Sequence, residues 1–249
     1  MDVPSMVYQG VVILLIGLHG TGKSTFAAAA AGADIEVGDG LDPCTSKCER
    51  YIVEQTSDAP QFTIIDTPGF ADKNTTEENM DVLRLIAEEL RNMGQERVSG
   101  IIFFHSIEGA RLTGVDHANL RILKSMCGEK FQRHVAFVTT RWDCMNDSED
   151  EKLVTRNNNI EVEFKKLLPK GPEIFKFLND GESHRPVLEH FAQLARTGTV
   201  APPLQFAEEL ERYYNKWMSK RAAVEKTKAG KEIRATSRKV GGWNYCTIL

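Results

Sequence analysis

The 249-residue sequence has few cysteines, and they follow none of the spacings that define a disulfide framework or a zinc site. Cys44 and Cys48 lie four residues apart, but no histidine or second cysteine pair completes a metal-binding set. The simplest interpretation is that all of them are free thiols in a reducing cytosol. The five cysteines are Cys44, Cys48, Cys127, Cys144 and Cys246.

The sequence also lacks long apolar runs. No stretch is long enough to span a bilayer, no N-terminal signal pattern is visible, and Asp2 after Met1 excludes N-myristoylation. The composition is that of a globular protein, with 41% hydrophobic and 27% charged residues, and the length suffices for one domain plus an appendage. We therefore expect a cytoplasmic protein without a membrane-spanning segment.

The most informative segment is glycine-rich. Residues 17–24 read Gly-Leu-His-Gly-Thr-Gly-Lys-Ser, the G-x-x-x-x-G-K-S pattern of a phosphate-binding loop, and they follow an apolar run, 11–16, that predicts a buried strand. Lys23 would reach the β- and γ-phosphates of a nucleotide, and the Ser24 hydroxyl would bind Mg²⁺. The alternative is an ordinary glycine-rich turn between a strand and a helix. The predicted contacts of this loop with the nucleotide are Gly17, His19, Gly20, Thr21, Gly22, Lys23, Ser24 and Thr25.

A second apolar run, 62–66, ends in Asp66-Thr-Pro-Gly69. An aspartate at the end of a strand can hold Mg²⁺ through water, and the Gly69 N–H can face a γ-phosphate. Thr-Pro-Gly is also good turn chemistry without any ligand. The segment is therefore evidence of a nucleotide site only in combination with the loop before it.

A third run, 134–139, precedes Thr140-Arg141-Trp142-Asp143, which resembles the guanine-specificity motif of GTPases. The Asp143 carboxylate would accept hydrogen bonds from guanine N1–H and the exocyclic amine, and Arg141 would lie over the base. Because this motif comes after two phosphate motifs, it favours GTP over ATP. In an ATP-dependent kinase, the remaining alternative, these four residues would have no purpose.

Apolar strand-like runs alternate with amphipathic helix-like runs, which predicts a doubly wound, mostly parallel α/β sheet. All three motifs fall at the carboxyl ends of strands, where such sheets bind their ligands. Thr75 and Glu78 are spaced to form a capping box for one helix. We expect strands near 11–16, 49–55, 61–66, 98–105, 134–139 and 173–177, and helices near 23–31, 76–92, 115–126, 150–167 and 185–196.

The sequence after the predicted nucleotide-binding domain, 1–197, has a different character. Residues 198–203 are typical of a linker, and 204–240 predict one long amphipathic, basic helical extension. Its apolar stripe packs on the domain or faces a partner or a membrane. From Lys216 to Lys239 the net charge is +7, against −4 for the whole chain, which indicates an anionic partner or a solvated helix face. We expect no nucleic-acid partner.

The last residues, 241–249, form a tail that ends in Cys246-Thr-Ile-Leu249. This tetrapeptide fits the C-a-a-X prenylation pattern of the geranylgeranyl type. A prenyl chain and a polybasic segment together make a stable membrane anchor. The sequence therefore predicts lipidation at Cys246 and association with an anionic membrane surface.

These residues resemble the GTPases of the septin/Toc/GIMAP branch of P-loop G proteins, and most of all the GIMAP-like G-domain proteins of fungi. The resemblance covers about 9–196. It is carried by Thr45-Ser-Lys-Cys48, similar to a T-x-x-C switch element, by Phe70 after Asp-Thr-Pro-Gly, and by a box that begins Phe104-His105 and runs through Arg111 to Met126-Cys-Gly128. It implies a G domain, bound GTP or GDP, and Thr45 as a third Mg²⁺ and γ-phosphate contact beside Ser24 and Asp66. His19 departs from the small or threonine-like residue usual in the loop.

The resemblance also implies G domains that pair face to face across their nucleotides. Ras-like GTPases place a water-orienting glutamine where this chain has Phe70, so intrinsic hydrolysis should be slow. A second copy could supply Arg111 or His105 in trans; the alternatives are a surface ion pair for Arg111 and a satisfied structural histidine. Asn179 is the candidate base contact of the last motif. The chain is then a dimer-activated GTPase with catalytic roles for Lys23, Thr45, Arg111 and His105, or a GTP-dependent membrane scaffold with little hydrolysis.

Overall fold

The structure is a computed structural model. It describes residues 10–33, 45–54, 56, 59–71, 75–94, 97–108, 112–142, 150–170, 173–216 and 218–241, with side chains as far as Thr236. Three predicted residues, Arg111, Asp143 and Cys246, lie outside these ranges.

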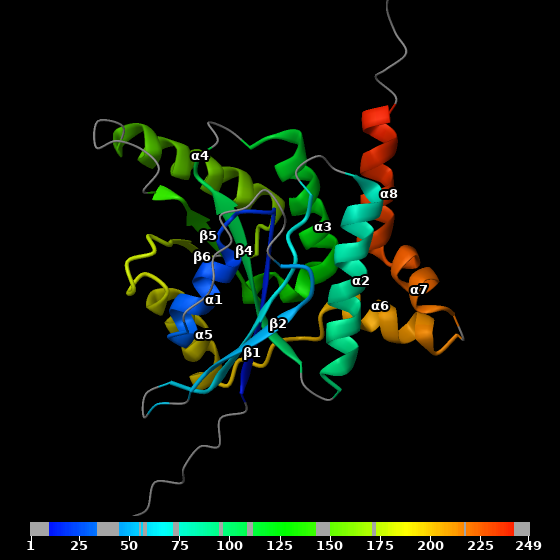
Figure 1. The fold of residues 1–249 in the computed structure, drawn as a ribbon, viewed down its shortest axis with the longest axis horizontal. Coiled ribbons are helices and arrows are strands. Elements are labelled where there is room, and N and C mark those ends of the chain that lie inside the picture. The colour runs from blue at the N-terminus through cyan, green and yellow to red at the C-terminus, as the bar shows by residue number, and fades with distance from the viewer. Residues whose placement is uncertain are drawn as a thin grey trace, which may run out of the picture.

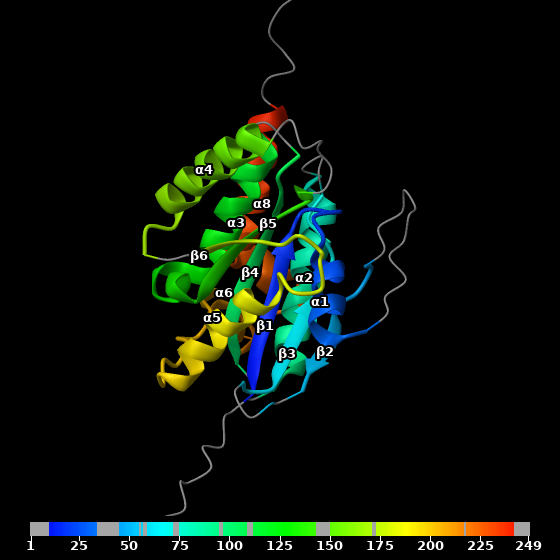
Figure 2. The ribbon, with the colours of Figure 1, turned by 90° about the vertical axis from the view of Figure 1, so that its left-hand side faces the viewer.

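A six-stranded sheet forms the centre of the molecule, in the order β2-β3-β1-β4-β5-β6. Figure 2 shows the strands crossing the molecule side by side, from β6 at the left to β2 at the right. All neighbours are parallel except β2 and β3, which confirms the predicted doubly wound, mostly parallel fold. The strands are β1 (Val11–Gly17), β2 (Glu49–Val53), β3 (Phe62–Asp66), β4 (Val98–Ser106), β5 (Val135–Thr140) and β6 (Glu173–Lys176).

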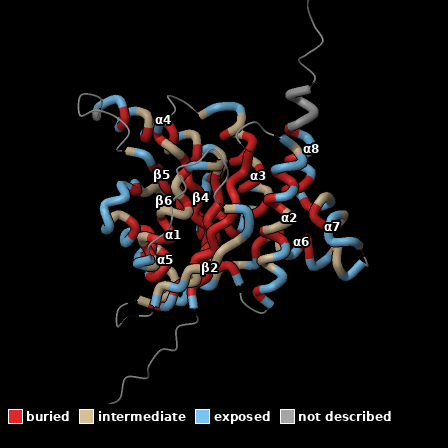
Figure 3. The backbone as a smooth tube through the Cα atoms, viewed as in Figure 1, coloured by how far each residue is buried: buried red, intermediate tan, exposed pale blue. Residues whose placement is uncertain are grey.

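Helices cover both faces of the sheet, so β1 and β5 are buried along their whole length (Figure 3). One face carries α1 (Lys23–Ala31) and α5 (Arg185–Arg196), which form a core with alternate residues of the strands. The other face carries α2 (Thr76–Asn92), α3 (Gly114–Phe131) and α4 (Asp150–Leu167). In Figure 1, α1 and α5 lie to the left of β1, and α2 lies to its right.

Helix α3 is longer than the sequence predicts, and it begins with the only complete capping box among the helices whose caps are described. The Thr113 hydroxyl accepts from the Asp116 N–H at 3.2 Å, and the Asp116 carboxylate accepts from the Thr113 N–H at 2.6 Å. The capping box expected at α2 is wrong. There the Thr75 hydroxyl bonds the Glu78 carboxylate and caps no backbone N–H.

The predicted long helix over 204–240 is also wrong, because the structure has three helices in its place. They are α6 (Gln205–Tyr214), α7 (Lys220–Lys226) and α8 (Lys228–Gly241). Thr227 breaks the last two apart: its backbone is extended, and its buried hydroxyl donates to the Val224 carbonyl at 2.7 Å and accepts from the Gly230 N–H at 3.1 Å. The helical spacing of apolar residues continues through Thr227, so the sequence pattern predicts one helix. Tertiary packing divides this segment into α7 and α8.

The three helices pack on the outside of α2 and α3 (Figure 1). Phe206, Leu210, Val224 and Ile233 are all buried and belong to the same core cluster as the sheet. The apolar stripe therefore packs on the domain, the first of the two predicted alternatives.

Part of the basic charge of the extension is neutralised within the chain. Lys220 pairs with Glu88 at 3.2 Å and Arg221 with Glu77 at 3.6 Å, both on the acidic helix α2. These pairs are exposed, so each contributes little to the stability of the fold. They nevertheless account for some of the charge asymmetry without an external partner.

Two of the cysteines lie in the described residues, Cys48 and Cys127, and both are free thiols, as expected. Burial, with the nearby carboxylates of Glu89 and Asp66, raises the pKa of Cys48 to about 12, so this thiol stays protonated. None of the helices in the described part of the chain combines the length and apolarity needed to cross a bilayer.

Candidate functional site

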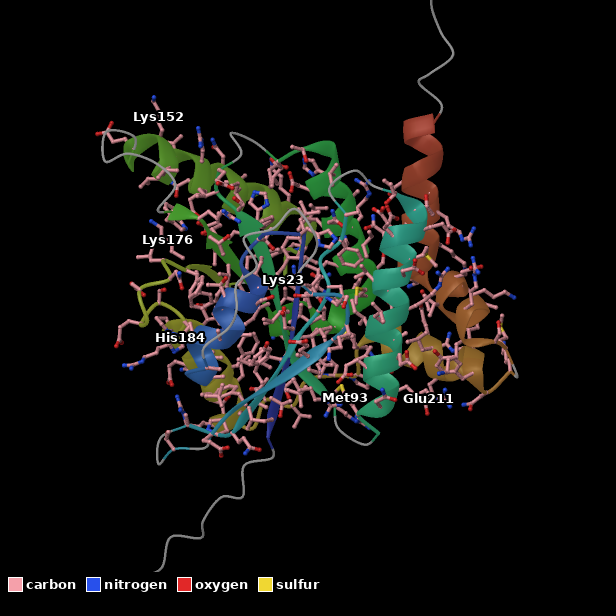
Figure 4. The ribbon with its side chains drawn as sticks, in the orientation of Figure 1. Lys23, Met93, Lys152, Lys176, His184 and Glu211 are labelled. Atoms are coloured by element: carbon pink, nitrogen blue, oxygen red, sulfur yellow. The ribbon has the colours of Figure 1, made fainter. Side chains whose placement is uncertain are left out.

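The three motifs meet at the carboxyl edge of the sheet, because β1, β3 and β5 are parallel and end there. Lys23, labelled in Figure 4, is the first residue of α1. The loop between β1 and α1 turns through two left-handed glycines, Gly20 at φ 68° and Gly22 at φ 82°. A Cβ at Gly17 would lie 2.7 Å from the Phe104 carbonyl oxygen, so the loop also needs glycine at its first position. The Lys23 ammonium is buried and donates to the Leu18 carbonyl at 2.9 Å.

Three oxygen-bearing side chains gather at the head of α1. The Ser24 hydroxyl donates to Asp66 Oδ2 at 2.6 Å and lies 3.1 Å from the Thr45 hydroxyl, which is itself 3.5 Å from the same oxygen. These are the three residues predicted to hold Mg²⁺. Hydroxyl and carboxylate oxygens are the ligand types that Mg²⁺ prefers.

Asp66 shows the electrostatic signature of a cation site. The residue is 1% exposed, and its Oδ1 has no hydrogen-bond partner among the described residues. Burial raises the pKa of this carboxyl, against the lowering effects of the Ser24 hydroxyl and the Lys23 charge. A divalent cation would supply the missing partner and restore the ionised form, so the donor set fits Mg²⁺.

The phosphate loop and the Asp-Thr-Pro-Gly segment are joined by their backbones. The His19 N–H donates to the Phe70 carbonyl at 3.1 Å, and the Phe70 N–H donates to the Gly17 carbonyl at 3.0 Å. A Cβ at Gly69 would lie 2.5 Å from the His19 nitrogen, so only glycine permits this approach. The Phe70 ring is 1% exposed and belongs to the core cluster beneath α2. Position 70 is therefore a packing position in this structure.

The third motif is tied to the phosphate loop by two side chains. The Thr140 hydroxyl donates to the Thr21 carbonyl at 3.0 Å. Arg141 donates to the Gly20 carbonyl through Nε at 3.1 Å and Nη2 at 3.0 Å, and its backbone is left-handed, with φ 59°. Its guanidinium also lies 3.8 Å from the Glu108 carboxylate. The structure thus brings together the segments that the sequence assigns to phosphate and to base.

Two residues of this region were missed by sequence reasoning, Glu108 and Lys176. Lys176, which is labelled in Figure 4, ends β6. Its ammonium lies 4.2 Å from the centre of the Trp142 ring. Glu108 lies inside the box that begins Phe104-His105, but that box assigned it no role. Lys176 belongs to no sequence motif, and only the parallel pairing of β6 with β5 could have placed it here. Asn179, the predicted base contact, is exposed in the loop after β6 with φ 55°.

His105 lies at the end of β4, but its side chain faces the helix layer. The ring is 6% exposed, with Nδ1 3.5 Å from the Asp116 carboxylate and the Phe164 ring edge-on at 5.9 Å. Burial opposes ionisation of Asp116, but hydrogen bonds from His105 and Thr113 outweigh it and lower the pKa of this carboxyl. These contacts are those of a structural histidine that supports the start of α3.

A cavity of about 780 Å³ lies elsewhere, between the end of α2, the start of β4 and α6. Met93 and Glu211, labelled in Figure 4, are among its lining residues, and Arg91, Leu204 and Tyr214 contribute further walls. None of the described motif residues lines it. The oxygen cluster at the carboxyl edge, and not this cavity, carries the chemistry that the sequence predicts.

Comparison with known proteins agrees with this geometry. The model of the AIG1 family matches residues 11–178. Toc33 from Arabidopsis thaliana, in complex with GDP and Mg²⁺, has a similar fold with a TM-score of 0.62; the match is 14% identical and covers 78% of this chain and 88% of that one. The bacterial selenocysteine-specific elongation factor EF-Sec has a TM-score of 0.55 at 16% identity, over 76% of this chain and 29% of that one.

A third solved structure concerns the chloroplast translocon components atToc33 and psToc159, for which dimerization is important for GTPase activity. It has a TM-score of 0.59 at 13% identity and covers 75% of this chain and 83% of that one. Among curated proteins, the probable FAD-binding monooxygenase ltbD of Aspergillus luteorubrus is 28% identical over 124 residues, which are 47% of this chain. The chain spans only 24% of the length of that protein.

Proposed function

The chain belongs to the AIG1 family, which places it in the Toc/GIMAP branch of P-loop GTPases, and from that premise we propose that it binds GTP with Mg²⁺ and hydrolyses it slowly. The observation that carries the proposal is the cluster of the half-buried Ser24 and Thr45 with the buried Asp66, beside Lys23, in which Asp66 Oδ1 has no hydrogen-bond partner among the described residues. In this proposal the three oxygens hold Mg²⁺, and the Lys23 ammonium binds phosphate oxygens. The bound ion neutralises charge on the phosphates.

Guanine is the proposed base because Thr140-Arg141-Trp142-Asp143 begins at the last residue of β5, and its first two residues are hydrogen-bonded to the phosphate loop. The solved Toc33 structures with GDP or GMPPNP and Mg²⁺ support the same nucleotide class. Asp143 is the residue that we propose for the base contact. Replacing it with asparagine should shift preference from GTP toward xanthosine triphosphate.

We propose slow hydrolysis because of the residue at position 70. A phenyl ring cannot orient water, and the Phe70 ring is buried in the core. Activation would then come from a second copy of the chain. The solved relatives support this, because dimerization is important for the GTPase activity of atToc33 and psToc159. We propose Arg111 for the trans role and His105 for support of α3, given the contacts of its ring with Asp116 and Phe164.

The test is turnover of GTP and ATP, measured side by side over a wide range of protein concentrations, with Lys23→Ala as the inactive control. Turnover of GTP per protomer that climbs with concentration, while ATP is ignored, supports a dimer-activated GTPase. Arg111→Ala should then abolish the climb and leave GTP affinity unchanged. A chain that prefers ATP, or binds neither nucleotide, contradicts the proposal.

The second candidate is a GTP-dependent scaffold at a membrane. Two exposed lysines of the extension, Lys226 and Lys231, have no ion-pair partner among the described residues, and together with a prenyl group on Cys246 they would favour an anionic surface. GTP binding without concentration-dependent turnover would favour this candidate. Equal partitioning of the full chain and its Cys246→Ser variant between membrane and cytosol would exclude the lipid anchor.

A further inference from the structure

The cavity between α2 and α6 has the dimensions and the lining of a ligand site. Its volume of about 780 Å³ lies within the range of about 300–1,000 Å³ that is typical of pockets for small molecules. Met93, at the end of α2, and Glu211, on α6, lie on two of its walls and are labelled in Figure 4. The lining residues that precede or belong to α6 recur at helical spacing, so one face of this helix forms a wall. They include Leu204, Ala207, Glu208 and Glu211.

The floor of this cavity is apolar. Met93, Val98 and Leu204 are buried, and all three belong to the core cluster beneath α2 and α3. Ala207 is half-buried and places only a methyl group on the wall. Because the floor side chains are held by core packing, an apolar group that enters the cavity meets a surface that is already formed.

The rim of the cavity carries charges of both signs. Arg91 and Arg97 lie at the end of α2 and just before β4, whereas Glu208 and Glu211 lie on α6. All four side chains are exposed, and none of them has an ion-pair partner among the described residues. The Arg91 guanidinium lies 5.7 Å from the centre of the Tyr214 ring, a cation–π contact between α2 and α6. The four charges sum to zero, which favours a ligand that carries both signs.

We propose that this cavity binds a single-chain zwitterionic amphiphile, a lipid-like molecule whose head combines a phosphate with a quaternary ammonium group. Its alkyl chain lies on the apolar floor, its phosphate faces Arg91 and Arg97, and its ammonium faces Glu208 and Glu211. An anionic amphiphile would meet the two glutamates uncompensated, and a cationic one would meet the two arginines. None of these residues belongs to the nucleotide site, so the inference does not depend on the proposed GTPase activity.

The test compares four amphiphiles that share a dodecyl chain and differ only in the head, each titrated into the full chain below its micelle concentration in a calorimeter. They are dodecylphosphocholine, dodecyl phosphate, dodecyltrimethylammonium and dodecyl maltoside. Dodecylphosphocholine should bind most tightly and the uncharged maltoside most weakly. The two singly charged heads should fall between them, because each keeps only one of the two sets of ionic contacts. Equal affinity for all four would overturn the inference, because the cavity would then select only the chain.

The rim charges are tested one sign at a time. Arg97→Gln should weaken dodecylphosphocholine about 2- to 5-fold, the effect of one exposed ionic contact, and should not weaken dodecyltrimethylammonium. Glu211→Gln should show the opposite selectivity, weakening the phosphocholine and sparing dodecyl phosphate. Arg133→Gln and Glu151→Gln, exposed charges outside the cavity, are the controls and should change nothing. Parent-like affinities in both rim variants would contradict the proposed head group.

A further variant tests the cavity itself. Ala207→Trp fills it from the α6 wall and should abolish binding of all four amphiphiles, whereas Val200→Trp, at a position that is 83% exposed, should not. Binding that survives Ala207→Trp would place the amphiphile elsewhere on the protein. Phosphatidylcholine vesicles present the same head with their chains held in a bilayer, so they should not compete with dodecylphosphocholine. Competition by intact vesicles would overturn the single-chain ligand.

Discussion

The carboxyl edge of the sheet and the cover formed by α6, α7 and α8 are built by different means. At the edge, close backbone approaches and polar side chains place a few atoms: two left-handed glycines, Gly69 close to the His19 nitrogen, and the buried Asp66 carboxylate, whose Oδ1 has no hydrogen-bond partner in the described part of the chain. In the cover, buried apolar side chains hold the helices in place, and Phe206 and Ile233 insert into the core beneath α2 and α3. The edge therefore presents polar groups that a ligand can bind, whereas the apolar side chains of the cover are already packed within the chain.

The largest expected effect tests the cover. Phe206→Ala should lower the free energy of unfolding by about 3–5 kcal/mol, because the ring is fully buried and its removal leaves a cavity. Chemical denaturation measures this loss. Val162→Ala, at an exposed position of α4, is the control and should change stability by less than about 0.5 kcal/mol. A loss below about 1 kcal/mol for Phe206→Ala would show that the cover is an attachment and not part of the core.

The second variant, at the carboxyl edge, should have the opposite pattern, with a large effect on binding and a small one on stability. Lys23→Ala should leave the midpoint of denaturation nearly unchanged and weaken GTP binding by about 2–5 kcal/mol, since it removes a buried charge that faces phosphate. Calorimetric titration with GTP and Mg²⁺ gives the affinity. Equal damage to folding and to binding would mean that the two regions are not separable in the way their contacts suggest.

These two regions also differ in how well the sequence predicts them. Residues 17–24 are recognisable because the loop is made by local chemistry: the glycines and Lys23 are needed where they stand in the chain. The break at Thr227 is not recognisable, because it depends on distant groups. The Lys228 N–H, just past the break, donates to the Glu209 carboxylate at 2.7 Å, across 19 residues.

The same limit applies within the site itself. Ser24 and Asp66 are predicted correctly as neighbours because both end or follow strands that lie side by side. Lys176 is missed, since its relation to Trp142 exists only through the register of β5 and β6. His105 is correctly predicted at the end of a strand. Alternation of side chains along β4, however, turns its ring toward α3 and α4 and away from the nucleotide site.

A third variant asks whether the free Asp66 oxygen is reserved for a cation. Asp66→Asn removes a buried charge, so the metal-free protein should be stabilised by about 1–3 kcal/mol, while the effect of Mg²⁺ on GTP affinity should vanish. Asp81→Asn, on the exposed side of α2, is the control. Metal-free Asp66→Asn that is less stable than the parent would show that the carboxylate is satisfied without an ion.

The pH dependence of the same group has a definite sign. Because the folded protein raises the pKa of Asp66 above its unfolded value of 3.8, the folded state binds the proton more tightly. This contribution to stability is therefore full below pH 3.8 and is lost as pH rises through the folded pKa. Metal-free protein should show this decline in denaturation experiments, and Asp66→Asn or saturating Mg²⁺ with nucleotide should flatten it.

The smallest expected effect concerns the junction of the cover with the domain. Gly128 interrupts α3 with φ 68°, and a Cβ there would lie 2.8 Å from the Gln205 side chain, whose amide donates to the Ser125 carbonyl at 3.0 Å. Gly128→Ala should thus cost about 1–2 kcal/mol through backbone strain, plus any displacement of Gln205. Gly114→Ala, in the first turn of the same helix, has open space and an ordinary φ, so it should be neutral or slightly stabilising. If the two substitutions have equal effects on the denaturation midpoint, the junction does not depend on the left-handed residue, and side-chain packing alone joins α6 to α3.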